Sequence, residues 1–185
     1  MYKPIRPVAK PKYTASENVT VVVPTIDCGP EILIALESWM KSNPKQVIFV
    51  TIPEMQASLK LLTRKIDPIG KTVKVITVPK GNKRNQMVAG INQVETAITI
   101  FCDDDVQWPD NFINHCIAPF EDDDMGGVGT SQRAIAQGKW FSIWEIMASF
   151  RVSMRNVEIT ASTFIDGGVV CLSGRTAAYR TVITN

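Results

Sequence analysis

Apolar positions along the chain follow two alternating spacings from residue 19 onward. Four runs of β-branched and apolar residues predict short buried strands at residues 19–23, 47–52, 73–78 and 97–102. Between these runs, apolar residues recur every three or four positions, which predicts helices with one buried face. The helical stripes are Ile32, Leu36, Trp39 and Met40; Met55, Leu59, Leu62 and Ile66; and Met87, Ile91 and Val94. We therefore expect an α/β fold of Rossmann-like alternating strands and helices, with a mostly parallel central sheet covered on both faces.

The length of 185 residues suits one domain with a substantial core. Residues 1–18 are rich in proline and basic residues and predict an extended linker, so the domain is expected to span residues 19–185. No signal peptide and no apolar run of about 18–20 residues is visible, so we expect this segment to be soluble or at most peripheral to a membrane.

Composition narrows the possible functions. The net charge of +2 gives no reason to expect nucleic acid as a partner. The four cysteines are far apart and form no CxxC pair, which favours buried thiols over a disulfide framework or a zinc site. The single histidine, His115, is expected to pack within a helix rather than bind a metal.

Charged and polar residues follow each predicted strand. Ligands of parallel α/β sheets bind beyond the carboxyl ends of the strands, so these residues are the candidates for a site. They are Thr25 and Asp27 after the first strand, Glu54 after the second, Lys80, Lys83 and Arg84 after the third, and Asp103, Asp104 and Asp105 after the fourth. Acidic and basic groups at one edge predict a phosphate ligand held with a divalent metal.

The acidic triplet is the strongest candidate within this set. In an extended segment Asp103 and Asp105 would face one way and Asp104 the other, so that two carboxylates could hold Mg²⁺ or Mn²⁺. The alternative is a solvated acidic turn. A second acidic run at residues 121–124 follows no strand and precedes two glycines, so it is interpreted as a surface loop. The buried strand before Asp103 favours a functional role for the first run.

The basic cluster at residues 80–87 is expected to begin a helix. A helix N-terminus favours anions, and the adjacent lysines and arginine strengthen that preference. A solvated helix start is an equally good interpretation of this segment taken alone.

Several of these segments resemble the motifs of family 2 glycosyltransferases. The triplet resembles the D-x-D motif of GT-A enzymes, residues 80–92 resemble their G-K-R-x-A-x-N-x-G stretch, and residues 126–133 resemble their V-G-x-x-x-Q-R strand. Residues 167–180 resemble the C-x-S-G-x-x-x-x-Y-R segment of hyaluronan-synthase-like enzymes and of related fungal polysaccharide synthases. The resemblance covers about residues 19–180 and implies a GT-A fold that is incomplete at the C-terminus.

The resemblance also implies roles for individual residues. Thr25 and Asp27 would lie near the uracil of a UDP-sugar, with Glu54 as a stand-in for the usual acidic end of the second strand. Asp103 would contact the nucleoside or ribose, and Asp105 would bind the metal, with Asp103 beside it. Lys83 and Arg84, or Lys80 in place of Lys83, would contact the diphosphate. Ser173, Gly174 and Arg175 would contact the sugar or acceptor.

The sequence departs from the family pattern near its end. The acidic motif that carries the general base, the Q-x-x-R-W motif and the membrane helices are not found before Asn185. The complete protein is thus expected to be an inverting hexosyl- or N-acetylhexosaminyltransferase that extends a polysaccharide at the cytosolic face of a membrane, expected to be the plasma membrane. It would be anchored through segments not present here. The chain alone is expected to bind donor and metal but to be inactive.

Two other functions remain open from the sequence. A sugar nucleotidyltransferase shares the architecture, but it would normally carry a glycine-rich loop after the first strand, where this chain has residues 24–27. A non-catalytic nucleotide-sugar-binding module would not need the missing base. Separately, Phe141, Trp144, Met147, Phe150 and Met154 predict a helix that packs into a core or interface, with an interfacial membrane helix as the alternative.

Overall fold

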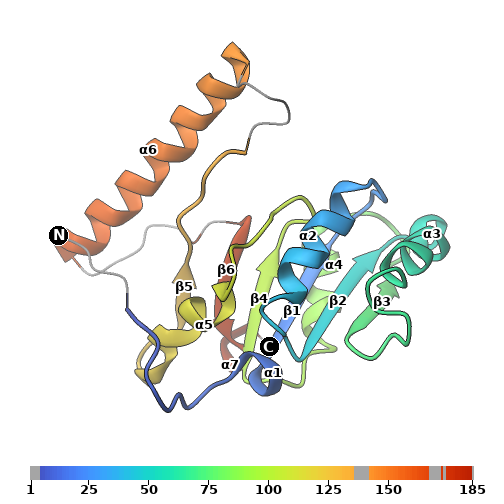
Figure 1. Cartoon of the computed structure of the whole chain (residues 1–185), viewed down its shortest axis with the longest axis horizontal. Coiled ribbons are helices and arrows are strands. Elements are labelled where there is room, and N and C mark those ends of the chain that lie inside the picture. Colours follow the sequence, from blue (N-terminus) through green and yellow to red (C-terminus); the bar gives the residue numbers. More distant parts are fainter. Residues whose placement is uncertain (1–4, 136–141, 167–171, 173, 185) are drawn as a thin grey trace. The chain divides into compact units, whose positions relative to one another are not determined.

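The computed structural model describes residues 5–135, 142–166, 172 and 174–184 (Figure 1). The chain forms two compact units. The larger comprises residues 5–128 and 174–185, and the smaller comprises residues 1–4 and 129–173. Each unit is described by itself below.

A six-stranded sheet forms the centre of the larger unit, with the strand order β3-β2-β1-β4-β6-β5. The strands β1, β2, β3 and β4 are parallel and β6 is antiparallel to β4, so the predicted mostly parallel sheet is confirmed. Their bounds are β1 Val19–Pro24, β2 Gln46–Thr51, β3 Val73–Thr77, β4 Ile98–Cys102, β5 Gly127–Gly129 and β6 Thr176–Arg180. The four long apolar runs of the sequence correspond to the four parallel strands.

Helices cover both faces of this sheet (Figure 1). On one face, α2 (Glu31–Met40), α3 (Pro53–Thr63) and α5 (Phe112–Ile117) pack in a core around Trp39 and Phe49. On the other face, α4 (Lys83–Ile91) packs on Val22, Val50 and Phe101. Successive residues of a strand point to opposite faces, so Val22 belongs to the second core while its neighbours belong to the first. This explains why the strands are apolar throughout.

Helix α4 lies unusually close to β1. Gly90 on α4 is buried, and a Cβ at this position would overlap the Cγ1 of Val22. The missing side chain therefore permits the close approach that brings the start of α4 to the end of β1.

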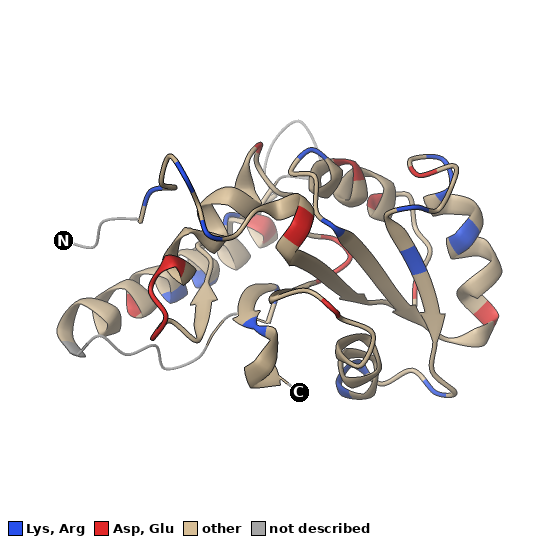
Figure 2. Cartoon of the chain, turned by 90° about the horizontal axis from the view of Figure 1, so that it is seen from below, with Lys and Arg blue, Asp and Glu red and all other residues tan. Residues whose placement is uncertain are grey.

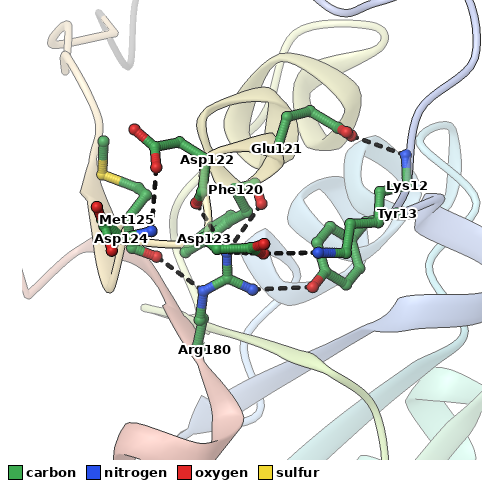
Figure 3. A network of polar contacts seen from close by, with 9 residues as sticks. All are labelled: Lys12, Tyr13, Phe120, Glu121, Asp122, Asp123, Asp124, Met125 and Arg180. Carbon is green, nitrogen blue, oxygen red and sulfur yellow. Dashed lines mark hydrogen bonds and ion pairs between the residues drawn. The ribbon is translucent and has the colours of Figure 1, made fainter.

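The N-terminal segment contacts the larger unit near the end of β6. Residues 15–18, within the stretch expected to be a linker, form the short helix α1 (Ala15–Asn18), and Ala15 is buried. The Arg180 guanidinium donates to Tyr13 Oη and to the carbonyl oxygens of Phe120, Asp122 and Met125, at 2.8–2.9 Å (Figure 3). The acidic run at residues 121–124 is predicted from the sequence to be a surface loop. Its first residue, Glu121, ends the 3₁₀ helix η1 (Ala118–Glu121) and is half-buried, and the three aspartates after it are exposed.

The acidic run also binds the N-terminal segment directly. Lys12 Nζ lies 2.6 Å from Asp123 Oδ1, and the Lys12 backbone N–H donates to Glu121 Oε1 (Figure 3). Through its own hydrogen bonds Arg180 joins β6 to the N-terminal segment at Tyr13 and to residues 120–125. Helix α7 (Thr181–Thr184) follows Arg180 directly.

The cysteines of the described residues are free thiols, as expected. Cys102 and Cys116 are buried, and burial raises the pKa of Cys116 to about 12. Cys28 is half-buried, and Cys171 lies outside the described residues. Burial also raises the pKa of Cys28 and Cys102, so none of the three described cysteines is placed for thiolate chemistry at neutral pH.

The described part of the smaller unit comprises residues 129–135, without a helix, and one long helix, α6 (Ile143–Asp166). The side chain of Asn156 on α6 exchanges two hydrogen bonds with the backbone of Gln132, at 2.7 and 3.1 Å. The predicted helix is present. Met147, Phe150 and Met154 are each 63% exposed, so the stripe does not lie in a core, and its packing in an interface stays a prediction. Phe141 lies outside the described residues. Among the helices that the structure describes, none combines the length and hydropathy needed to cross a bilayer.

Candidate functional site

A hollow of about 350 Å³ lies at the carboxyl ends of β1 and β4, beside the first turn of α4. Acidic and basic residues are otherwise interspersed over the helices, strands and loops (Figure 2). The hollow is lined by Pro24, Thr25, Ile26, Asp27, Gly81, Asn82, Lys83, Gln86, Asp103, Asp104 and Asp105. Three chain segments far apart in sequence therefore meet where parallel α/β sheets bind ligands.

Lys83 and Asp103 form an ion pair across this hollow. Lys83 is the first residue of α4, and its Nζ lies 2.5 Å from Asp103 Oδ1. The helix start is fixed by Asn82, whose side chain accepts a hydrogen bond from the Asn85 N–H at 3.2 Å. The predicted adjacency of the basic cluster and the acidic triplet is confirmed. A cation, a helix N-terminus and several carboxylates thus share one cavity.

The acidic triplet forms a turn, so the expectation of an extended segment is wrong. The Val106 N–H donates to the Asp103 carbonyl oxygen at 3.3 Å, and the chain turns at Asp104 and Asp105. Because a turn does not alternate side chains as a strand does, all three carboxylates line the same hollow. Asp104, expected to face away, is therefore a site residue that the strand pattern missed.

Asp103 and Asp104 are half-buried in the hollow, and Asp105 is exposed. Burial raises the pKa of Asp104, the nearby hydroxyl of Thr25 opposes this shift, and the charges of Asp105 and Asp103 add to it. The causes that raise this pKa follow from one arrangement, in which negative charges lie close together and partly out of water. A cation bound here would relieve their repulsion.

Thr25 and Asp27 form the wall of the hollow at the end of β1. The buried Thr25 hydroxyl accepts a hydrogen bond from the Asp27 N–H and donates to the Asp27 carbonyl oxygen, each at 3.1 Å. This local turn reverses the chain directly after β1. The Asp27 side chain is exposed.

Gln86 supports this wall from α4 and was not predicted as a site residue. It is 2% exposed, and its Nε2 donates to the carbonyl oxygens of Thr25 and Val50 at 2.8 and 2.7 Å. A single buried amide thus joins the ends of β1 and β2 to α4. The available signal was its position three residues after Lys83, on the same side of the predicted helix.

The turn before β6 reaches the acidic triplet through the backbone. The Asp103 N–H donates to the Arg175 carbonyl oxygen at 2.9 Å, which brings Gly174 and Arg175 beside the carboxylates. Both residues are exposed, and a Cβ at Gly174 would meet no atom within 4 Å. Ser173 lies outside the described residues. Of the predicted sugar or acceptor segment, the described part lies next to the hollow.

Three predicted site residues lie elsewhere. Glu54 is exposed on the first turn of α3, and Lys80 and Arg84 are exposed on either side of the start of α4. None of the three lines the hollow. Lys83, rather than Lys80, is thus the lysine that the fold directs to the acidic triplet, because the helix begins at Lys83.

The donor set suits a cation that keeps other ligands. Within the part of the chain that the structure describes, no three acidic, histidine or cysteine side chains are grouped as a complete metal site. The carboxylates of the triplet offer hard oxygen ligands, as Mg²⁺ and Mn²⁺ prefer. Such a cation would complete its coordination with water or with oxygens of a bound ligand.

Known proteins share both the sequence and the fold. The family described as "Glycosyltransferase like family 2" matches residues 16–185. A "Type 2 glycosyltransferase" of Zymoseptoria tritici is 43% identical over 183 residues, which are 98% of this chain and 38% of that protein. The chain thus spans little more than a third of the length of this curated relative.

Solved structures show the fold. The mannosyltransferase PcManGT of Pyrobaculum calidifontis, in complex with GDP-Man and Mn²⁺, matches 93% of this chain and 48% of its own, with a TM-score of 0.65 and 17% identity. The 4-diphosphocytidyl-2C-methyl-D-erythritol synthase of Anaerococcus prevotii matches 91% of this chain and 73% of its own, with a TM-score of 0.55 and 9% identity. The second match shows that nucleotidyltransferases share the architecture, while the family match concerns the sequence itself. The chain has the GT-A fold and belongs to glycosyltransferase-like family 2.

Proposed function

We propose that residues 19–185 supply the nucleotide-sugar-binding part of an inverting glycosyltransferase that takes a sugar from a UDP-sugar and adds it to a polysaccharide. The observation that carries this proposal is the meeting of Lys83, the start of α4 and the Asp103–Asp105 turn in one hollow. This combination suits a diphosphate ligand, whose negative charge is stabilised both by cations and by backbone N–H donors.

The diphosphate is proposed to lie against the first turn of α4. There Lys83 is 55% exposed, so its ammonium can contact a phosphate while it remains near Asp103. Thr25 and Asp27 are proposed to line the side that receives the base, since they form the wall at the end of β1.

A divalent cation is proposed to bind between Asp105, Asp103 and the diphosphate. It would offset the negative charge that grows on the departing nucleoside diphosphate. The chain's own contribution is to hold two carboxylates at fixed positions, through the turn that Val106 closes and the backbone bond to Arg175. A solved transferase with this fold contains GDP-Man and Mn²⁺, a ligand pair of the same chemical kind.

The acceptor is proposed to approach along Gly174 and Arg175, with Ser173 before them. The whole protein is proposed to act at the cytosolic face of a membrane. Transfer also requires a carboxylate base to take the proton of the acceptor hydroxyl. Donor binding does not require this base, so binding can be measured on residues 1–185 by themselves.

Calorimetric titration tests the proposal. We expect UDP to bind in the presence of Mn²⁺ and binding to fall at least about tenfold without the metal. The double variant Asp103→Asn, Asp105→Asn should lose the metal dependence, and Glu54→Gln, outside the hollow, should leave binding unchanged. Binding of UDP that is indifferent to metal and to the double variant would contradict the proposed site.

The nucleotide preference separates the alternatives. Preference for CTP or ATP over UDP would favour a sugar nucleotidyltransferase. Preference for GDP would retain the transferase and change the donor. UDP binding by a full-length form without sugar transfer to any polysaccharide acceptor would favour a non-catalytic binding module.

A further inference from the structure

Helix α6 displays a continuous apolar stripe at its surface. Seven residues of the helix are apolar and are separated alternately by four and three positions: Ile143, Met147, Phe150, Met154, Val157, Ala161 and Phe164. All seven are exposed, and the six larger side chains are 63–75% exposed. Helices seldom expose so many large apolar side chains on one side unless another surface covers them.

The opposite side of α6 already has a packing partner within the smaller unit. Val152, Asn156 and Ile159 are half-buried, and Asn156 bonds to the backbone of Gln132. The helix therefore uses its more polar side to pack on its own unit and leaves its more apolar side exposed. This is the reverse of the usual orientation of an amphipathic helix.

The spacing of the stripe indicates what kind of surface fits it. Alternation of four and three residues over three heptads is the repeat of a coiled-coil seam, which winds around another helix of the same repeat. At 24 residues the helix is about 36 Å long, enough for several layers of side chains to interdigitate. A helical partner is thus favoured over a flat one.

The charges beside the stripe identify the partner and its direction. Arg151 and Glu158 flank the seam on the same side, one heptad apart. When two copies of α6 pair in antiparallel orientation, Arg151 lies opposite Glu158 of the partner subunit, and the two-fold symmetry creates this pair twice. The same register places Trp144 opposite Ile165 of the partner subunit.

A parallel pair lacks this complementarity. In that orientation Arg151 would face Ile146 of the other copy, and Glu158 would face Ser153. We propose that α6 forms an antiparallel two-helix coiled coil with α6 of a second copy of this chain. The inference is independent of the proposed donor site, since no residue of α6 lines the hollow.

Sedimentation velocity over a range of concentrations tests the pairing on residues 1–185. The wild type should show a reversible monomer–dimer equilibrium, and Phe150→Glu should be monomeric throughout. Arg151→Glu should weaken the dimer about tenfold, because two attractive pairs become repulsive, and Glu158→Arg should do the same. The double variant R151E/E158R should restore the wild-type affinity.

Arg155→Glu is the matched control. This variant has the same change of charge as Arg151→Glu, and Arg155 is exposed on the same helix but lies away from the seam. The dimer affinity of the variant should therefore equal that of the wild type. Thermal unfolding of each variant should match that of the wild type at concentrations low enough for all of them to be monomeric, because dimerisation itself raises the midpoint and these side chains are at the surface of the monomer.

Two results would overturn the proposal. A wild type that is monomeric at every concentration excludes self-pairing, and a double variant that fails to recover excludes the antiparallel register. Vesicles of phosphatidylcholine with phosphatidylserine test the other occupant. Binding that Arg151→Glu and Arg155→Glu weaken equally, and Glu158→Arg strengthens, would assign the stripe to a lipid surface.

Discussion

Replacement of Gln86 by leucine isolates the hydrogen bonds that join α4 to the ends of β1 and β2. The amide of Gln86 is buried and donates to Thr25 and Val50. Leucine has a similar size, so the change removes two hydrogen bonds without opening a large cavity. The carbonyl oxygen of Val50 keeps its bond from the Thr25 N–H at 3.0 Å, whereas the carbonyl of Thr25 loses the donor that Gln86 provides.

The expected cost follows from this count. Each lost hydrogen bond costs about 0.5–1.5 kcal/mol, so the two together cost about 1–3 kcal/mol, and an unpaired buried carbonyl brings the sum toward the upper part of this second range. Burial of leucine atoms recovers a part of it. We therefore expect Gln86→Leu to lower the free energy of unfolding by about 2 kcal/mol. With a urea slope of about 2 kcal/mol/M, the unfolding midpoint should fall by about 1 M.

Urea unfolding followed by circular dichroism measures this shift, with Gln93→Leu as the control. Gln93 is exposed just after α4 and accepts one hydrogen bond from Lys74, so its replacement should change stability by less than about 0.5 kcal/mol. Equal midpoints for the two variants would refute the structural role of Gln86. The variant should also bind UDP more weakly, since Thr25 lines the hollow.

Three further variants test other parts of the structure. Asp67 accepts four backbone N–H bonds from residues 70–73 at 2.8–3.2 Å; burial opposes these bonds, but together they hold its pKa below the ordinary 3.8. The stabilisation that ionised Asp67 gives the fold is thus complete above pH 3.8 and is lost as the pH falls through the lowered pKa. Asp67→Asn should therefore be about 1 kcal/mol less stable than the wild type at pH 7. In acid-unfolding curves the two proteins should approach the same stability below the lowered pKa. Gly90→Ala should lower the thermal midpoint through overlap with Val22, at a cost of about 1–3 kcal/mol, whereas an added helix-favouring alanine without strain would raise it. Arg180→Lys should cost about 2–4 kcal/mol because an ammonium cannot replace the planar fork, and trypsin should then cleave the N-terminal segment near Lys12 faster; an unchanged cleavage rate would contradict the contacts of Figure 3.

The parallel strands and the helices between them could be predicted because each of them carries its signal locally. The run at residues 19–23 is apolar on both faces, and this requires cover on both sides of a sheet. The same pattern predicts where the site lies, because the residues that follow parallel strands all lie at one edge of the sheet. The sequence therefore predicts that Lys83 and Asp103 lie together.

Other features depend on contacts between distant residues. The orientation of β6 is decided by its pairing with β4, and nothing within residues 176–180 states that direction. Asp104 joined the hollow because one backbone hydrogen bond turns the chain after Asp103. The sequence shows Gln86 only as a polar residue of a helix, because its two hydrogen-bond acceptors lie at the ends of β1 and β2. The stripe on α6 predicted a helix correctly, but amphipathicity alone does not say which surface covers it.

The reversal of β6 determines which part of the chain can alter the hollow. Each of the parallel strands runs toward the edge of the sheet where the hollow lies, so the loop after the strand contributes to the hollow. Because β6 runs the other way, the segment before Thr176 arrives at the carboxylates, and the chain after Arg180 departs from the remote edge. Insertions or substitutions directly before Thr176 can therefore change the shape and charge of the hollow, whereas residues 181–184 lie at the opposite edge of the sheet, where the Thr181 N–H donates to the Ala97 carbonyl oxygen.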